Sequence, residues 1–173
     1  MIIKSADRET EFYQIHQLNY KTFVEEILQH QPNDEKILID KFHFKNKYII
    51  ALKNEQVIGM VCYNQLRPFS LDDKIPNLDT YLPNHNQLAE IRLLAVAREE
   101  RRITIAYRLL KYLCAELIRN NIDTAVISGT TRQIRLYSSM GFTPFGPLVG
   151  RENALFQPMF ITLNELRNDF KTN

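Results

Sequence analysis

Residues 94–110 (LAVAREERRITIAYRLL) constrain the fold of this chain most strongly, because the hydrophobic pattern changes its period within them. The stretch Leu88–Val96 alternates like a half-buried strand, with one face predicted to carry Leu88, Glu90, Arg92, Leu94 and Val96. From residue 106 the apolar residues recur with the spacing of a buried helix face: Ala106, Leu109, Leu110, Leu113, Cys114 and Leu117. The segment therefore predicts a strand, a short basic turn and a helix.

The basic turn carries two adjacent guanidinium groups, Arg101 and Arg102, just before the predicted helix. The first N–H groups of a helix have no partner within it and lie at the positive end of its dipole. Two guanidinium groups beside these N–H groups strengthen the attraction for phosphate. The sequence therefore predicts that this turn binds a ligand that carries a pyrophosphate.

The same stretch resembles the acyl-CoA-binding signature of the GNAT N-acyltransferases, in which Leu-x-Val precedes Arg/Gln-x-x-Gly-x-Gly/Ala and a helix. Leu94 and Val96 match the strand end, Arg101 matches the Arg/Gln, and Ala106 matches the last small residue. Thr104 replaces a glycine, so its Cβ restricts the approach of phosphate to the backbone, although its hydroxyl offers a hydrogen bond. The resemblance implies a coenzyme A site formed by Leu94, Ala95, Val96, Arg101, Arg102, Ile103, Thr104, Ile105 and Ala106.

A second motif, LYSSMGF at residues 136–142, resembles the Tyr-x-x-x-Gly-Phe of the same family. Gly141 is predicted to end a helix in the left-handed conformation, with Phe142 turning into the core. In the family the tyrosine lies near the thioester sulfur and protonates the departing thiolate, so the resemblance implies this role for Tyr137. The alternative is a core tyrosine whose hydroxyl reaches the surface.

The resemblance implies the α/β (α+β) GNAT fold, with a mixed, mostly antiparallel central sheet of about seven strands flanked by helices. In this fold the fourth and fifth strands splay apart, and the pantetheine arm completes their backbone pairing. The segments ISGTTRQIRLY, RPFSLD, FQPM and FVEE also resemble a GNAT-like module fused to class V aminotransferases. That likeness implies an amine acceptor from amino-acid or aminophosphonate metabolism. A more distant likeness is to the N-acyl amino acid synthases, which use long acyl chains on a carrier protein.

The bulk properties predict one cytoplasmic enzyme domain over residues 1–173. A formal net charge of +2 is too small to indicate nucleic-acid or membrane binding. Cys62 and Cys114 lie in predicted core elements, which favours a reducing compartment over a disulfide framework. The first residues contain too short an apolar run for a signal peptide. The oligomeric state stays open from the sequence, and a homodimer is one possibility.

The remaining elements are expected from periodicity and turn residues. Helices are predicted at residues 9–28 (with a break near 19–20), 34–42, 105–120 and 131–140. Strands are predicted at residues 2–6, 47–52, 56–66, 123–128, 142–147 and 154–163. Residues 67–86 contain three prolines and little periodicity, so they are predicted to form a loop that could cover a site.

Glu90 is the best candidate for a general base. An amine acceptor is mostly ammonium at neutral pH and must lose a proton before it attacks a thioester. The run AEIRLLAV resembles the strand of certain histone acetyltransferases in which the glutamate acts as base. The alternative is a structural pair between Glu90 and Arg92, which would also hold the carboxylate ionised.

The acceptor side is predicted to involve Glu25 and Glu26 on the first helix, together with Arg92 and Thr130. The glutamates could instead be a solvated helix face, and Thr130 could be a helix N-cap. The histidines show no spacing typical of a metal site, so no metal is expected.

Three functions remain open from the sequence. The first is transfer of an acetyl group from acetyl-CoA to a small primary amine, with Glu90 as base, Tyr137 as acid and a strand N–H stabilising the oxyanion. The second is transfer of a long acyl chain from acyl carrier protein, which would require a wide apolar tunnel. The third is a non-catalytic coenzyme A sensor or a partner domain for an aminotransferase.

Overall fold

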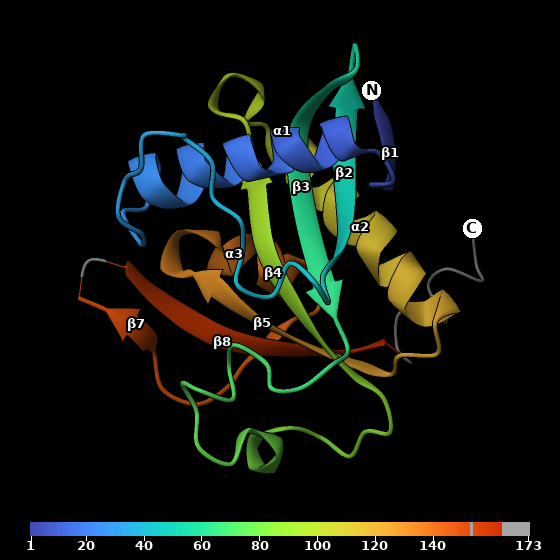
Figure 1. Cartoon of the computed structure of the whole chain (residues 1–173). Coiled ribbons are helices and arrows are strands. Elements are labelled where there is room, and N and C mark those ends of the chain that lie inside the picture. Colours follow the sequence, from blue (N-terminus) through green and yellow to red (C-terminus); the bar gives the residue numbers. More distant parts are fainter. Residues whose placement is uncertain (153, 164–173) are drawn as a thin grey trace. The chain divides into compact units, whose positions relative to one another are not determined.

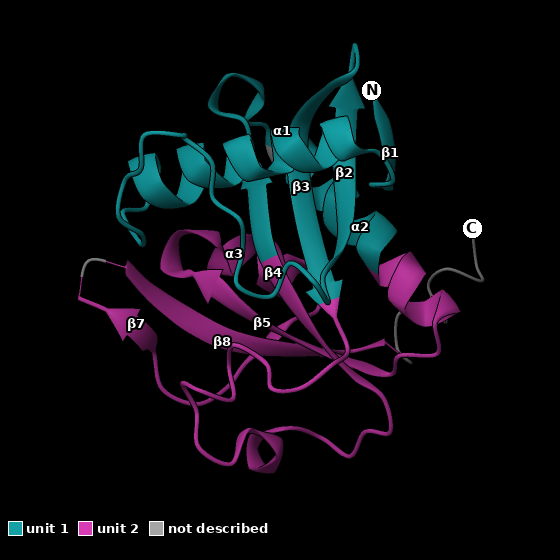
Figure 2. Cartoon of the chain, viewed as in Figure 1, with its two compact units in different colours: residues 1–63, 93–113 teal, residues 64–92, 114–173 magenta. Residues whose placement is uncertain are grey.

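The computed structural model describes residues 1–152 and 154–163, apart from the side chain of Ile103. The chain divides into two compact units, which are coloured separately in Figure 2. Unit 1 comprises Met1–Tyr63 and Leu93–Leu113, and unit 2 comprises Asn64–Arg92 and Cys114–Asn173. The assignment of residues 1–173 to a single domain stays a prediction.

Within residues 1–152 and 154–163 the strands form an eight-stranded, mostly antiparallel sheet in the order β1-β2-β3-β4-β5-β8-β6, with β7 paired to β8. In unit 1, β1 (Ile2–Ser5) pairs with β2 (Lys47–Lys53), which pairs with β3 (Gln56–Asn64). Asn54 and Glu55 both have positive φ, as a tight hairpin turn between twisted strands requires. The structure confirms these three strands, which the sequence predicted. It also confirms the predicted mixed α/β fold class.

The first helix changes type after Tyr20. The α-helix α1 (Glu9–Tyr20) continues as η1 (Lys21–Glu26), a π-helix in which Ile27 N–H donates to the carbonyl of Thr22, five residues earlier, at 2.9 Å. The break that was predicted in this helix near residues 19–20 is therefore confirmed. The buried face of this helix joins an apolar core in unit 1 formed by Ile15, Leu18, Phe23, Tyr48, Ile50, Val57, Met60, Cys62 and Ala95.

The predicted helix at residues 34–42 is wrong, because side chains there stabilise turns. Lys36 has a positive φ, which no α-helix accommodates. The Asp40 carboxylate accepts a hydrogen bond from Phe42 N–H at 3.1 Å, and Asn33 Nδ2 donates to the carbonyl of Ile37 at 2.9 Å. Such local bonds compete with the helical ladder.

Strand β4 (Leu88–Val96) has the predicted bounds but not the predicted alternation. Leu93 has a φ of 57°, and a left-handed residue inside a strand breaks the two-residue repeat. Leu93, Ala95 and Ala97 pack with the core of unit 1. The expectation that Leu94 and Val96 share a face with Glu90 is therefore wrong.

Unit 2 is built around β5 (Thr124–Thr130) and β8 (Ala154–Thr162), shown in Figure 1. β5 pairs in parallel with β4 and antiparallel with β8, and β8 pairs with β6 (Thr143–Pro144) and β7 (Val149–Arg151). The three-residue β7 was not predicted, since so short a strand leaves no periodic signal. With β7, the described part of the chain has eight strands instead of the predicted seven or so.

The helices after β4 follow the predicted pattern. Helix α2 (Ile103–Arg119) buries the stripe that its spacing predicts, and the missing side chain of Gly59 allows its close approach. A Cβ at Gly59 would lie 3.1 Å from Leu109 and 3.3 Å from Ile105. A 3₁₀ turn, η4 (Thr131–Gln133), leads into α3 (Ile134–Ser139), and Gly141 follows with a φ of 93°. The predicted left-handed cap at Gly141 is confirmed.

Residues 67–86 form the predicted loop, apart from a 3₁₀ turn, η2 (Leu78–Tyr81). No helix among the described residues is long and apolar enough to cross a membrane.

Candidate functional site

The turn between β4 and α2 holds Arg101 at the start of the helix. After Val96 the chain makes one 3₁₀ turn, η3 (Arg98–Glu100), and α2 begins at Ile103. Arg101 Nη2 donates to the carbonyl of Val96 at 3.2 Å and to Glu26 Oε2 at 2.8 Å. The guanidinium is therefore held against the end of β4, and Glu26 is its counter-ion.

The other residues predicted to bind coenzyme A surround this turn. Arg102 and Thr104 are exposed, whereas Ile105 and Ala106 are buried and anchor the first turn of α2. Ala95 and Val96 are buried at the strand end, and Leu94 is half-buried. The side chain of Ile103 lies outside the described residues. This arrangement joins a helix N-terminus to exposed guanidinium groups, which favours an anionic ligand.

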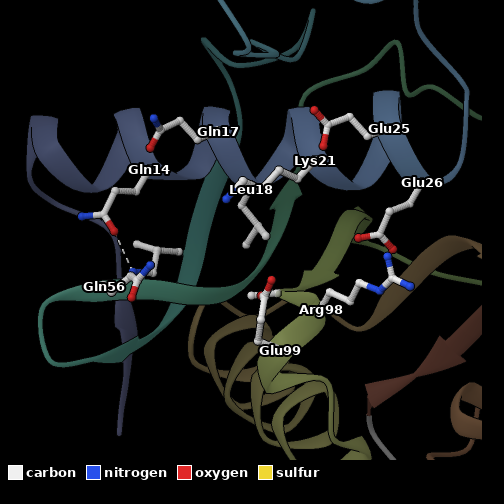
Figure 3. A pocket seen from close by; sticks show the side chains of 11 residues that line it. Gln14, Gln17, Leu18, Lys21, Glu25, Glu26, Gln56, Arg98 and Glu99 are labelled. Atoms are coloured by element: carbon white, nitrogen blue, oxygen red, sulfur yellow. Dashed lines mark hydrogen bonds between the residues drawn. The ribbon is translucent and has the colours of Figure 1, made fainter.

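Unit 1 contains a pocket of about 380 Å³ beside this turn, shown in Figure 3. Residues from α1, η1, the start of β3 and the segment after β4 line it: Gln14, Gln17, Leu18, Lys21, Glu25, Glu26, Gln56, Val57, Ala97, Arg98 and Glu99. Glu25 and Glu26, both predicted on the acceptor side, thus border one pocket. Five of its eleven lining residues carry charge, two positive and three negative.

Glu90 lies on β4 in unit 2 and is 2% exposed. Its two carboxylate oxygens accept hydrogen bonds from the backbone N–H groups of Ser70 at 2.9 Å and Leu71 at 3.0 Å. Arg92 Nε lies 3.7 Å from the same carboxylate, so the predicted pair with Arg92 is present but is the longer contact. Burial raises the pKa of Glu90 above its ordinary value, against the opposing effects of Arg92 and the two N–H groups.

The partners from Ser70 and Leu71 were missed because a backbone N–H has no sequence signature. The segment RPFSLDD (residues 67–73) carried a weaker signal, which indicates a fixed turn in this loop. Arg67 pairs with Asp72, and the Asp72 carboxylate accepts from Phe69 N–H at 2.6 Å, which fixes the loop where it meets Glu90. Charged side chains close together in a proline-containing loop indicate such a fixed turn.

Tyr137 lies on α3 in unit 2 and is 2% exposed. Its hydroxyl donates to Gln133 Oε1 at 3.1 Å, and the same oxygen accepts from Thr130 Oγ1 at 3.2 Å. The hydroxyl therefore bonds within the protein rather than reaching the surface. Burial raises the pKa of Tyr137, so the phenol stays protonated at neutral pH. Thr130 occupies the N-cap position of η4, but its hydroxyl donates to Gln133 and makes no capping hydrogen bond.

The strand register separates Glu90 from Tyr137. Glu90 pairs with Val126 in the parallel ladder, so their side chains share a face. The Tyr137 ring packs on the opposite face, because a Cβ at Gly129 would lie 2.6 Å from its Cδ2 and Cε2 atoms. The ladder runs from Leu88–Thr124 to Ile91–Ile127, and both strands continue beyond it. A carboxylate and a phenol thus flank the paired strands from opposite faces.

Comparison with known proteins identifies the family. A model described as the acetyltransferase (GNAT) family matches residues 10–142. The chain belongs to the GNAT family. This GNAT chain is therefore an N-acyltransferase, as the two motifs predicted. A search of curated proteins found no significant match.

Solved structures similar to this GNAT enzyme share its fold. The CoA-dependent acyl-homoserine lactone synthase BjaI, solved with SAM and isopentyl-CoA, has a TM-score of 0.79 at 20% identity, over 94% of this chain and 80% of BjaI. FeeM, an N-acyl amino acid synthase from uncultured soil microbes, has a TM-score of 0.71 at 18% identity, over 97% and 98% of the two chains. An aminoglycoside 6'-N-acetyltransferase complexed with coenzyme A has a TM-score of 0.67 at 15% identity, over 94% and 97%. Sequence identity at these levels supports the shared fold alone.

Within residues 1–152 and 154–163, no group of three or more His, Cys, Asp or Glu side chains is arranged to hold a metal ion. The expectation of metal-free chemistry stays a prediction.

Proposed function

We propose that this GNAT enzyme transfers an acetyl group from acetyl-CoA to the primary amine of a small molecule. The observation that carries the proposal is the turn before α2, where Arg101 and the helix N-terminus lie together. The pyrophosphate of coenzyme A would bind the first N–H groups of α2, with Arg101 and Arg102 as charged donors. Arg101 would then exchange its bond to Glu26 for one to phosphate.

The pantetheine arm would pair with backbone that lies beyond the β4–β5 ladder. Arg92 on β4 and Ser128 on β5 follow the last paired residues, Ile91 and Ile127. Amide groups of pantetheine can bond to such strand edges as a further strand does. A backbone N–H in this region would stabilise the oxyanion of the tetrahedral intermediate.

The proposed chemistry uses Glu90 and Tyr137 in different steps. Glu90 takes a proton from the ammonium, and the free amine attacks the thioester carbonyl carbon. The C–S bond then breaks, the thiolate takes the Tyr137 proton, and the surplus proton on the new amide nitrogen leaves through solvent, which restores the Tyr137 phenol. A raised pKa makes the buried Glu90 a stronger base, and each of its oxygens keeps a second lone pair besides the bond from Ser70 or Leu71. Because the two side chains lie on opposite faces, neither titrates the other directly.

A second candidate is transfer of a longer acyl chain, from acyl carrier protein or CoA. The likeness to BjaI, crystallised with isopentyl-CoA, and to the N-acyl amino acid synthase FeeM favours it. Family membership argues against a non-catalytic module.

The experiment is a screen of primary amines and amino acids that follows free thiol release from acetyl-, octanoyl- and palmitoyl-CoA and from acyl carrier protein. Both cysteines are buried, and burial raises the pKa of Cys114 to about 12, so the protein itself gives little thiol background. We expect amine-dependent release that is fastest with acetyl-CoA. Release from long acyl donors alone would support the second candidate and overturn the first. No release from any donor would overturn both.

A further inference from the structure

Ser128 on β5 carries a hydroxyl that is buried without a hydrogen bond. Its Oγ atom has no hydrogen-bond partner in the part of the chain that the structure describes. The next hydroxyl along the strand, that of Thr130, donates to Gln133 Oε1 at 3.2 Å. Burying a hydroxyl without a hydrogen bond costs free energy, and few native side chains are left in this state. The Ser128 hydroxyl therefore calls for a partner that the protein itself does not supply.

The side chain of Ser128 lies on the same face of the sheet as Glu90. Glu90 pairs with Val126 in the parallel ladder, so these two side chains share a face. β5 keeps a regular register with β8 from Thr124 to Thr130, and strand alternation therefore returns Ser128 to the face of Val126. Gly129, the next residue, faces the Tyr137 ring, as the same alternation requires.

The backbone of Ser128 points toward the β4 side of β5, which lies between β4 and β8 in the sheet (Figure 1). Ser128 pairs with Pro158 of β8, and the Pro158 carbonyl accepts from Phe145 N–H at 3.0 Å, on the β6 side of β8. Because proline also lacks an N–H, this pair makes no backbone bond between β5 and β8. The N–H and C=O of Ser128 therefore point toward β4, just beyond the last ladder residue, Ile127.

Ser128 thus borders the place where the proposed reaction would occur. The pantetheine arm would pair with this backbone, and the amine would attack from the face that carries Glu90. Strand spacings of about 4.8 Å across the ladder and about 6.6 Å along it place the Cα atoms of Glu90 and Ser128 about 8 Å apart. One nitrogen atom between their side chains can therefore lie within hydrogen-bond distance of both.

We propose that the Ser128 hydroxyl binds the attacking nitrogen of the acceptor and orients it. This inference rests on the proposed transfer to a primary amine and adds a residue to its site. One N–H of the ammonium gives its proton to Glu90, and a second donates a hydrogen bond to Ser128 Oγ, where no covalent bond changes. An amine held by one contact rotates about it, whereas two contacts direct its lone pair at the thioester carbon.

The test compares two variants of nearly the same shape. Ser128→Thr keeps the hydroxyl, and Ser128→Val has a methyl group in its place. Steady-state kinetics with an acceptor found in the screen should give Ser128→Val a kcat/KM for the acceptor about 10- to 100-fold below that of Ser128→Thr. Ser128→Ala should lose about the same factor relative to the wild type. KM for the acyl donor should be equal in all of these proteins.

Two further measurements separate orientation from other roles. The loss in Ser128→Ala should persist at high pH, because orientation is needed by the free amine too, whereas the loss in Glu90→Gln should shrink there. Ser128→Ala should unfold at a temperature no lower than the wild type, because the lost hydroxyl makes no bond within the described protein. Ser139→Ala removes an exposed hydroxyl on α3 and should keep wild-type kinetics.

The outcomes distinguish this inference from the proposed function. Amine-dependent thiol release with equal acceptor kcat/KM in Ser128→Thr and Ser128→Val would overturn the role of Ser128 and leave the transfer reaction intact. A rise in KM for the acyl donor alone would assign the hydroxyl to the donor and overturn the role as well. A loss that disappears at high pH would assign Ser128 to proton removal, against orientation. Absence of release by the wild type from every donor would overturn the proposed function itself.

Discussion

The Tyr137 hydroxyl is enclosed by protein, and its single proton is directed at Gln133. Replacing it with phenylalanine removes one hydrogen bond but leaves Gln133 bonded to Thr130. Tyr137→Phe should therefore unfold with a free energy lower by only about 1 kcal/mol. If the phenol protonates the thiolate, kcat should fall by about 10- to 10³-fold with little change in KM for acetyl-CoA.

Steady-state kinetics at saturating acceptor measure this effect. Unchanged turnover would leave Tyr137 as a packing residue. A large rise in KM for acetyl-CoA with unchanged kcat would mean that the hydroxyl binds the donor instead.

Gly129 is required because the Tyr137 ring occupies the space of a side chain. A Cβ there would lie 2.6 Å from two ring carbons, closer than any van der Waals contact. Gly129→Ala should lower the free energy of unfolding by about 1–3 kcal/mol, because the ring must shift in a packed site. Urea denaturation checks this. In the double variant with Tyr137→Ala the clash is absent, so the two costs should not add. Strict additivity would contradict this steric explanation.

The buried carboxyl of Glu90 makes stability depend on pH. Its pKa is raised in the folded protein above the ordinary value of 4.5, so the folded state binds this proton more tightly than the unfolded state. The stabilising contribution of Glu90 is therefore full below about pH 4.5 and declines as the pH rises through the folded pKa. Glu90→Gln cannot ionise and lacks this decline.

Urea denaturation of both proteins between about pH 4 and pH 8 tests the sign. The free energy of unfolding of the wild type, minus that of Glu90→Gln, should fall as the pH rises. A difference that stays constant or grows would contradict a raised pKa. In the same variant, loss of the proposed base should lower kcat by about 10²-fold, with a smaller defect at high pH, where more amine is already deprotonated.

At the scale of elements, the ion pair between Glu26 on η1 and Arg101 engages one of the two guanidinium groups of the proposed phosphate site. Glu26 forms an ion pair with Arg101, so a phosphate that binds Arg101 must displace the Glu26 carboxylate. Glu26→Gln should tighten coenzyme A binding by about 2- to 5-fold, the scale of one exposed ion pair. Glu25→Gln removes the same charge from the neighbouring residue and is the control. Calorimetry that shows equal affinities in both variants would mean that the pair does not compete with the ligand.

Elements with a strong period or a defined cap were predictable. The strand Leu88–Val96, helix α2 and the glycine cap after α3 follow directly from residue pattern. The failures have local causes. The left-handed Leu93 breaks the alternation in β4, and the Asp40 carboxylate stabilises a turn where a helix was expected. A left-handed leucine within a strand and an Asx turn have no hydrophobic signature of their own, so the sequence pattern does not reveal them.

At the scale of the whole molecule, two short motifs predicted the family that the comparison confirms. The candidate residues were predictable as residue types, but their surroundings were not. The contacts of Ser70 and Leu71 with Glu90 join segments 20 and 19 residues apart, and their approach depends on the path of the loop. The bond from Tyr137 to Gln133 spans four residues, but the residue types alone do not show that it forms. The charged pocket likewise depends on a π-turn, which has no distinct hydrophobic signature.

The central claim is that the turn before α2 binds the pyrophosphate of an acyl-CoA. Calorimetric titration of coenzyme A into the wild type, Arg101→Glu and Arg108→Glu tests it most directly. Arg108 is exposed on α2, so its variant controls for the change in net charge. Arg101→Glu should lose on the order of 2–4 kcal/mol of binding free energy, roughly 30- to 700-fold in Kd, because a charged donor is replaced by a repelling carboxylate. Arg108→Glu should bind nearly as well as the wild type. Equal affinity in folded Arg101→Glu, or no coenzyme A binding by the wild type, would contradict the claim.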